Sequence, residues 1–262
     1  MNQNPDITQL FQTAQQDGTL STEAAQALSV VDIGAQIQAG LGTPVDNVQS
    51  SEVILVTMMP DDSGSIRSSG NAQVVRDGHN LVLDALASSK QKSGVLAHTR
   101  YLNGHVLFPY CPLDQSVRLD KKNYNPSLGT PLFDQTVVLL GTVLAKAQQF
   151  SDNGVAVRTV TLIITDGADA GSQQATAKTV AQIVRDMLKT EQHIVAAMGI
   201  DDGSTCFKSI FKSMGISDEW ILTPGNSQTE IRKAFQVFSQ SALRASQSAQ
   251  NFSKMAAKGF FN

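Results

Sequence analysis

The chain has 262 residues, 41% of them hydrophobic, which is enough for one large α/β domain with a short appendage. Its formal net charge is −3, and no cluster of Lys and Arg could neutralise a run of phosphates, so we expect no nucleic-acid partner. The opening residues lack the basic-then-apolar order of a signal peptide, and no apolar run approaches the roughly 20 residues that cross a bilayer. We therefore expect a cytoplasmic protein with no membrane partner. The two cysteines, which have no metal or disulfide spacing, are compatible with that location.

The first 50 residues differ in composition from the rest, being rich in Gln and Ala and interrupted by glycine-containing breaks. Ile7, Leu10 and Phe11 fall on one helical face, and a second stretch with helical spacing follows Ser21, which is a favourable N-cap residue. We predict an N-terminal helical extension over residues 1–50, made of two short helices that dock on the main body.

From residue 51 the chain alternates between β-rich runs and segments with helical periodicity. The run 53–58 is almost continuously apolar, which predicts a central strand buried on both faces, and the β-branched run 157–165 predicts a second central strand. Asn103-Gly104 separates the runs 96–102 and 105–109 and favours a type I′ hairpin turn, hence an antiparallel strand at the sheet edge. Further strands are expected at 193–200 and 220–222, and helices at 71–89, 131–150, 174–190, 205–213 and from 227 onward.

These elements predict an α/β fold of Rossmann-like type: a doubly wound, mostly parallel six-stranded sheet with one antiparallel edge strand and helices on both faces. Ser227 and Glu230 have the spacing of a capping box for the final helix, whose buried stripe would contain Phe235 and Phe238. We place the main domain over residues 51–245 and expect residues 246–262 to form a tail that continues the last helix.

The sequence Asp61-Asp62-Ser63-Gly64-Ser65 directly follows the first central strand. In a doubly wound sheet the ligand crevice lies outside the carboxyl ends of the strands, so this position favours a binding role. Asp61, Ser63 and Ser65 alternate and offer only oxygen ligands, which suit Mg²⁺ or, less specifically, Mn²⁺ or Ca²⁺. By itself the motif is weak evidence for a metal, because a polar turn that caps the next helix commonly has the same residues.

Two later residues complete the pattern. Thr130 lies in Leu128-Gly-Thr-Pro-Leu132 just before a helix, and Asp166 lies in Ile163-Ile-Thr-Asp-Gly167 at the end of the next central strand. Taken alone, Thr130 is typical of an N-cap and Asp166 of a turn. Taken together with the first motif, all three pieces supply oxygen ligands at or beside the carboxyl ends of strands.

This combination resembles the metal-ion-dependent adhesion site of von Willebrand factor A (vWA) domains, over about residues 52–245. By that resemblance Asp61, Ser63, Ser65, Thr130 and Asp166 match the five site positions, and the site is identified as intact. The resemblance implies a stand-alone, bacterial-type domain that is not an enzyme and that binds a partner protein.

The resemblance also implies how the partner is held: a divalent ion, Mg²⁺ first, keeps an open coordination position that an Asp or Glu of the partner fills. Because few of its ligands are charged, the ion retains excess positive charge and attracts that carboxylate. An adaptor or scaffold role follows, and a component of a MoxR-type AAA+ ATPase system is the partner suggested by relatives of this kind.

Four residues flank the site and are expected at a partner-binding rim: Asp62, Arg67, Asn125 and Asp169. Charged loop residues are usually just solvated, which is the competing interpretation. The four histidines have no HxH or HExxH spacing and are expected to be structural.

Two alternatives remain open at the level of sequence. A Mg²⁺-dependent phosphoryl-transfer hydrolase of the haloacid dehalogenase type also places Asp residues after strands, but it needs a second Asp where Ser63 stands, as well as a lysine that is not evident. Alternatively, the ion is structural and the partner binds another surface, such as the N-terminal extension.

Overall fold

A computed structural model describes residues 6–260 and shows a six-stranded sheet with the strand order β3-β2-β1-β4-β5-β6. The strands are β1 (Glu52–Pro60), β2 (Val95–Arg100), β3 (Val106–Pro112), β4 (Ala156–Thr165), β5 (His193–Gly199) and β6 (Ile221–Leu222). All neighbouring pairs are parallel except β2–β3, so β3 is an antiparallel edge strand. The predicted fold class is confirmed.

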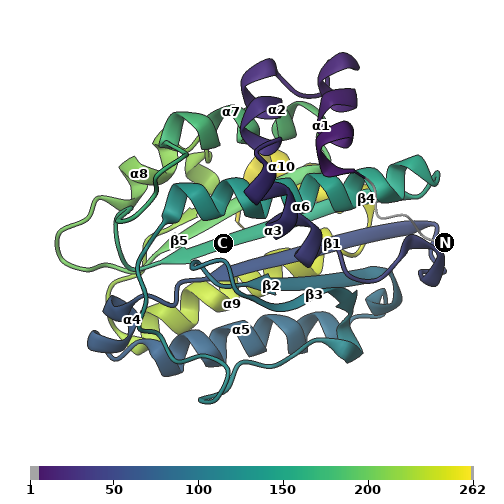
Figure 1. Cartoon of the computed structure of the whole chain (residues 1–262). Coiled ribbons are helices and arrows are strands. Elements are labelled where there is room, and N and C mark those ends of the chain that lie inside the picture. The colour runs from purple at the N-terminus through teal and green to yellow at the C-terminus, as the bar shows by residue number, and fades with distance from the viewer. Residues whose placement is uncertain (1–5, 261–262) are drawn as a thin grey trace.

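Helices cover both faces of this sheet (Figure 1). On one face lie α6 (Leu132–Asp152) and α7 (Ala177–Lys189), and on the other lie α5 (Ala72–Ala87) and α9 (Gln228–Ala245). The short helices α4 (Gly64–Ser68) and α8 (Phe207–Ser213) follow β1 and β5. No helix among residues 6–260 is long and apolar enough to cross a membrane.

The two central strands follow from their sequences. β1 and β4 pair in parallel from Glu52↔Ala156 to Pro60↔Ile164, and almost all of their side chains are buried on both faces. Strands that are buried on both faces and rich in apolar and β-branched residues are typical of a parallel sheet that helices cover on both sides. Since both strands end at the same edge of the sheet, the residues that follow them, Asp61 and Asp166, come together.

The packing of α5 on α9 depends on a missing side chain. A Cβ atom placed on Gly78 of α5 would lie 2.1 Å from the ring of Phe235 on α9. Phe235 and Phe238 are fully buried, as the apolar stripe predicted. One half of the capping box predicted for α9 is present, because the Ser227 hydroxyl accepts a hydrogen bond from the amide of Glu230. The other half differs: the Glu230 carboxylate accepts from the Ser227 hydroxyl and not from the backbone amide of Ser227.

The hairpin turn between β2 and β3 is not of type I′. That turn needs positive φ at both central residues, but among the described residues other than glycine only Glu191 has positive φ, so Asn103 does not. Gly104 has φ 95°, and the Asn103 carboxamide instead accepts a hydrogen bond from the amide of His105. An Asx interaction therefore takes the place of the expected backbone conformation.

Residues 6–50 of the N-terminal extension contain three α-helices rather than two, followed by a short 3-10 helix at Val45–Asn47: the α-helices are α1 (Ile7–Gln16), α2 (Thr22–Leu28) and α3 (Val31–Gly40). The side chains of Ile7, Phe11 and Leu28 join the main hydrophobic core, and Ser21 caps α2 through the amide of Ala24. Figure 1 shows these helices over the face that carries α6 and α7. The extension thus packs on the main body, while its boundary at residue 50 stays a prediction.

The C-terminal segment does not continue the last helix. α9 ends at Ala245, and a separate helix, α10 (Ala249–Lys258), begins after Ser248, whose hydroxyl accepts from the amide of Asn251. Phe252 of α10 is fully buried. This apolar anchor holds α10 against the domain.

Candidate metal-binding site

The first site loop is shaped by Asp61 itself. One carboxylate oxygen of Asp61 accepts a hydrogen bond from the amide of Ser63 at 2.7 Å, which turns the chain sharply after β1. α4 then begins at Gly64, so that Ser63 precedes the helix and Ser65 lies in its first turn. A Cβ atom on Gly64 would meet nothing within 4 Å, so the turn does not require glycine. Glycine instead leaves the surface beside the two serines uncovered.

The second part of the site lies at the end of β4. Thr165 donates from its hydroxyl to the other carboxylate oxygen of Asp61 at 2.7 Å, and the amide of Asp166 approaches the same oxygen at 3.4 Å. The hydroxyl of Ser65 in turn donates to the carboxylate of Asp166 at 2.5 Å. The hydroxyls of Ser63 and Ser65 are 2.8 Å apart. Four of the five predicted residues thus form one continuous set of oxygen atoms.

Thr130 is brought to the same place by its backbone. The segment 128–130 forms isolated β-bridges to Ser63 on one side and to Ala170 on the other. A Cβ atom placed on Gly167 would lie 3.8 Å from the hydroxyl of Thr130 and 3.9 Å from that of Ser65. Thr130 is buried, with 7% of its surface exposed, and among residues 6–260 no hydrogen bond to or from its hydroxyl is found. It is therefore available as a ligand.

The electrostatics of the site are those of uncompensated negative charge. Burial raises the pKa of Asp61 and raises the pKa of Asp166 to about 6, in spite of the hydrogen bonds that favour their ionised forms. Within residues 6–260 neither carboxylate forms an ion pair. Nor does any group of three or more His, Cys, Asp or Glu side chains there come together to hold a metal. A cation at this point would be held by two carboxylates and up to three hydroxyls.

The four expected rim residues separate into two kinds. Asp62 is only 6% exposed, accepts from the amide of Asn103, and has its pKa raised to about 6 by burial. Asp169 is half-buried and accepts from the amide of Phe133 and the hydroxyl of Ser172. Both carboxylates hold neighbouring backbone in place. Arg67 and Asn125 are exposed, so only these two rim residues lie open to a partner.

Sequence reasoning missed three residues that hold the ligands. Ser69 donates to Asp166 at 3.2 Å, Thr165 orients Asp61, and the hydroxyl of Tyr124 donates to the backbone carbonyl of Asp61. Thr165 precedes Asp166 directly and could have been found from that position. Ser69 and Tyr124 give no signal, because only the fold brings them to the site.

Three of the four histidines lie in the protein interior and have structural hydrogen bonds. His79, His98 and His193 are buried and hydrogen-bonded, and burial lowers the pKa of each to about 4, 3 and 4 respectively. Asp201 to Gly203 forms a turn before α8, with Gly203 at φ 80°.

No protein-family model matches the sequence, and no curated protein matches it. Solved structures do share the fold. The pilus adhesin SpaC of Lactobacillus rhamnosus GG aligns with a TM-score of 0.54 and 11% identity, over 75% of this chain and 31% of SpaC. Proximal thread matrix protein 1 (PTMP1) of the mussel byssus aligns with a TM-score of 0.50 and 17% identity, over 74% of this chain and 47% of PTMP1.

Both aligned regions are vWA domains, and at these identities the likeness shows the fold alone. The vWA-like fold that the sequence motifs implied is thereby confirmed. This chain spans about a third of SpaC and about half of PTMP1.

Proposed function

We propose that this protein is a divalent-metal-dependent protein-interaction module that binds Mg²⁺, with Mn²⁺ or Ca²⁺ as substitutes, through Asp61, Ser63, Ser65, Thr130 and Asp166. The observation that carries this proposal is the convergence of two carboxylates and three hydroxyls at the ends of β1 and β4. Asp61 and Asp166 have no cationic partner among the described residues, and a bound cation would compensate both charges.

The donor set supports a recruiting ion more than a purely structural one. Two carboxylates match the formal charge of a divalent ion, and the three hydroxyls add no further negative charge. The ion would retain attraction for a further carboxylate, and Ser65 and Gly64 leave its outer side open to solvent. The partner would then present an Asp or Glu, with Arg67 and Asn125 at the edge of the contact.

The finer parts of the proposal rest on the family resemblance of the site motifs. They are an adaptor or scaffold role in the cytoplasm, without catalysis, and a partner from a MoxR-type AAA+ ATPase system.

Metal binding is tested first by calorimetric titration of the purified protein with Mg²⁺ and with Mn²⁺. We expect saturable uptake by the wild type, loss of uptake in Ser65→Ala, and normal uptake in Ser68→Ala. Ser68 is the matched control because it lies in the same helix, is exposed, and donates only to the backbone carbonyl of Ser65. Absence of uptake by the wild type would refute the proposal.

Partner binding is then tested by affinity capture in Mg²⁺ and in EDTA, with the same two variants. A partner that is retained in Mg²⁺ by Ser68→Ala and lost by Ser65→Ala supports recruitment through the ion. A partner captured equally in EDTA would show that another surface binds it. A phosphatase assay with Mg²⁺ on generic phosphomonoesters distinguishes the interaction module from a phosphoryl-transfer hydrolase of the haloacid dehalogenase type. We expect no turnover.

A further inference from the structure

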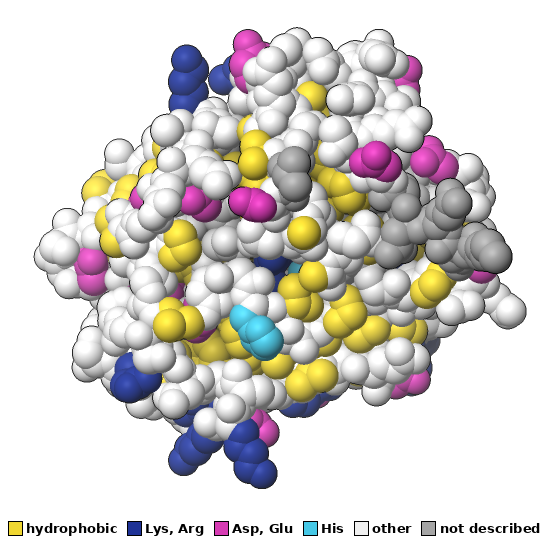
Figure 2. Space-filling model, in the orientation of Figure 1, with side chains coloured by type: hydrophobic (Ala, Val, Ile, Leu, Met, Phe, Trp, Pro, Cys, Tyr) yellow, Lys and Arg dark blue, Asp and Glu magenta, His cyan; other side chains and the backbone are white. Residues whose placement is uncertain are grey.

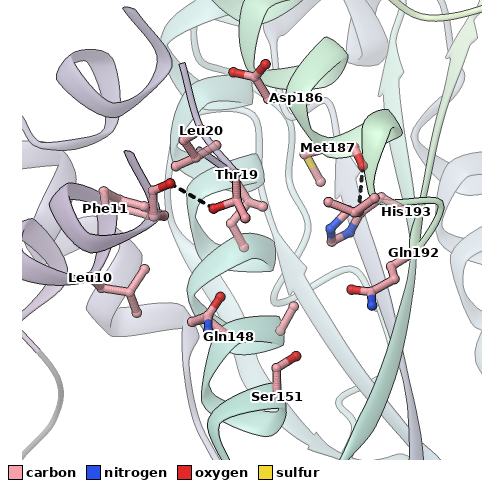
Figure 3. Close-up of a pocket in the computed structure, with 14 residues that line it drawn as sticks. Leu10, Phe11, Thr19, Leu20, Gln148, Ser151, Asp186, Met187, Gln192 and His193 are labelled. Carbon is pink, nitrogen blue, oxygen red and sulfur yellow. Dashed lines mark hydrogen bonds between the residues drawn. The ribbon is translucent and has the colours of Figure 1, made fainter. Parts of the chain in front are cut away.

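A second candidate site lies between the N-terminal extension and the main domain. It is a cavity of about 230 Å³, enclosed by α1 and the turn after it, by the C-terminal half of α6, and by the junction of α7 with β5. In Figure 3, Leu10 and Phe11 lie on one side, Met187 and His193 on the other, and Gln148 and Ser151 of α6 between them. β5 begins at His193, whereas Asp61 and Asp166 follow the ends of β1 and β4. The cavity is therefore at the opposite edge of the sheet from the candidate metal site.

The cavity has an apolar interior and a polar mouth. Phe11, Leu20, Ala147 and Met187 are buried at its floor, and the half-buried side chains of the walls are also apolar. The exposed residues at its mouth are polar: Thr19, Gln148, Ser151, Thr190 and Gln192. An apolar body with one deeply placed polar group is the common pattern of small-molecule sites.

Two polar side chains at this cavity are buried, Asp186 and His193, and the imidazole of His193 is the one that has a nitrogen free of hydrogen bonds within the described part of the chain. This side chain is 4% exposed, and its Nδ1 pairs with the hydroxyl of Thr159 at 2.8 Å. None of the hydrogen bonds found among residues 6–260 involves its Nε2, and this atom is not one of the fully buried side-chain atoms, so it can be reached from outside the core. A polar atom at the end of an apolar cavity is more stable when a ligand or a water molecule satisfies it. Burial lowers the pKa of His193 to about 4, so the ring is neutral near pH 7 and offers one hydrogen bond.

The charge at the cavity wall restricts the ligand further. Burial alone would raise the pKa of Asp186, but hydrogen bonds from Lys189 and Ser21 outweigh it and hold that pKa below its ordinary value. The ionised carboxylate lies beside the cavity, and its oxygens already accept from the Ser21 amide and hydroxyl and from Lys189. An anionic ligand would be repelled, and a cationic one would find that carboxylate already compensated.

We propose that this cavity binds a neutral, mostly apolar small molecule that carries one hydroxyl or amide group, with its apolar part against Phe11 and Met187 and its polar group at Nε2 of His193. The volume suits one substituted aromatic ring, because a buried apolar cavity of about 150 Å³ is enough for benzene. Since α1 forms one wall, the bound molecule would contact the N-terminal extension and the domain together.

Three probes with the same tolyl group test the ligand chemistry: p-cresol, toluene and p-toluate, titrated into the full-length protein at pH 7 and followed by NMR chemical shifts. We expect saturable binding of p-cresol, about three- to tenfold weaker binding of toluene because it lacks the hydrogen bond, and no binding of the p-toluate anion. Shifts should map to α1, α6 and the α7–β5 junction.

Two variants test the position of the site and its polar contact, and a third serves as the control. Ala14→Phe fills the cavity from the α1 wall and should abolish binding, whereas Ala39→Phe makes the same change on the exposed surface of α3 and should leave it intact. His193→Phe should remove the preference for p-cresol over toluene, a ratio that does not depend on the stability of the fold. The proposal is overturned by unsaturable shifts with all three probes, by tighter binding of p-toluate, or by binding to Ala14→Phe as strong as to the wild type.

Discussion

The Asp166→Asn variant separates the stability of the metal-free protein from its response to metal. In the wild type the Asp166 carboxylate accepts from the hydroxyls of Ser65 and Ser69. An asparagine at this position keeps one oxygen acceptor, and a serine hydroxyl can rotate to accept from its amide group instead. The substitution therefore removes a charge while retaining the local hydrogen bonds.

We expect Asp166→Asn to be more stable than the wild type in EDTA. The pKa of Asp166 is about 6 against an ordinary 3.8, which corresponds to about 3 kcal/mol against the ionised form in the folded state. Screening at this partly open site reduces the gain to about 1 to 2 kcal/mol at pH 8. Because a raised folded-state pKa destabilises the fold only where the group is ionised, the gain should shrink as the pH falls from 7 to 4.

In saturating Mg²⁺ the wild type should instead be more stable than Asp166→Asn. A ligand at 100 times its dissociation constant stabilises the folded state by about 2.7 kcal/mol, and the variant should receive little of this because it lacks one of the two carboxylates. The assay is urea denaturation of both proteins in EDTA and in saturating Mg²⁺. If the variant is destabilised in EDTA and yet gains as much from Mg²⁺ as the wild type, the assignment of Asp166 as an ion ligand is wrong.

Three further predictions concern the scaffold. Gly78→Ala should lower the free energy of unfolding by about 2 kcal/mol or more, because its Cβ would overlap the ring of Phe235. Gly64→Ala is the control, because its Cβ meets nothing within 4 Å, and its free energy of unfolding should stay within about 0.5 kcal/mol of the wild type in urea denaturation. An equal effect of the two substitutions would contradict the packing of α5 on α9. Protonation of His79 should lower the free energy of unfolding of the wild type by about 2 kcal/mol between pH 7 and pH 5, because the unfolded state binds this proton near pH 6.5 and the folded state only near pH 4. The His79→Gln variant should lack this contribution when denaturation is measured as a function of pH. Parallel pH profiles for the two proteins would contradict the prediction. Phe252→Ala should cost about 3 kcal/mol in urea denaturation, and a cost near zero would mean that α10 does not anchor the domain.

The helices and strands predicted best from the sequence are those whose burial follows one regular pattern along their whole length. β1 and β4 are buried on both faces because helices cover both faces, so a run of mostly apolar and β-branched residues identified them. The helix α9 shows a regular stripe that includes Phe235 and Phe238, and its burial was predicted from that spacing. The closeness of Asp61 and Asp166 followed in the same way, since strand ends that share one edge of a sheet bring their next residues together.

The predictions failed where tertiary contacts decide a local structure. α3 contains Gly34 and Gly40 and has no side-chain cap, so its propensity is weak, and it is stabilised by burial of Ile33 and Ile37. α10 has only two large apolar residues, Phe252 and Met255, and the position of Phe252 beneath the guanidinium of Arg158 follows from the fold and not from the sequence pattern. The same limit applies to Asp62 and Asp169, whose carboxylates turn inward to backbone amides that no sequence spacing identifies.

These inward-facing residues explain why the candidate metal site can hold buried, uncompensated charge. The Asp61 backbone carbonyl is bound by Tyr124, its carboxylate by Thr165 and Ser63, and the two flanking loops by Asp62 and Asp169. These hydrogen bonds hold the Asp61 carboxylate, the Asp61 carbonyl and the two loops in place, which favours a preorganised set of oxygen atoms. A cation bound among them would add its binding free energy to the stability of the folded domain.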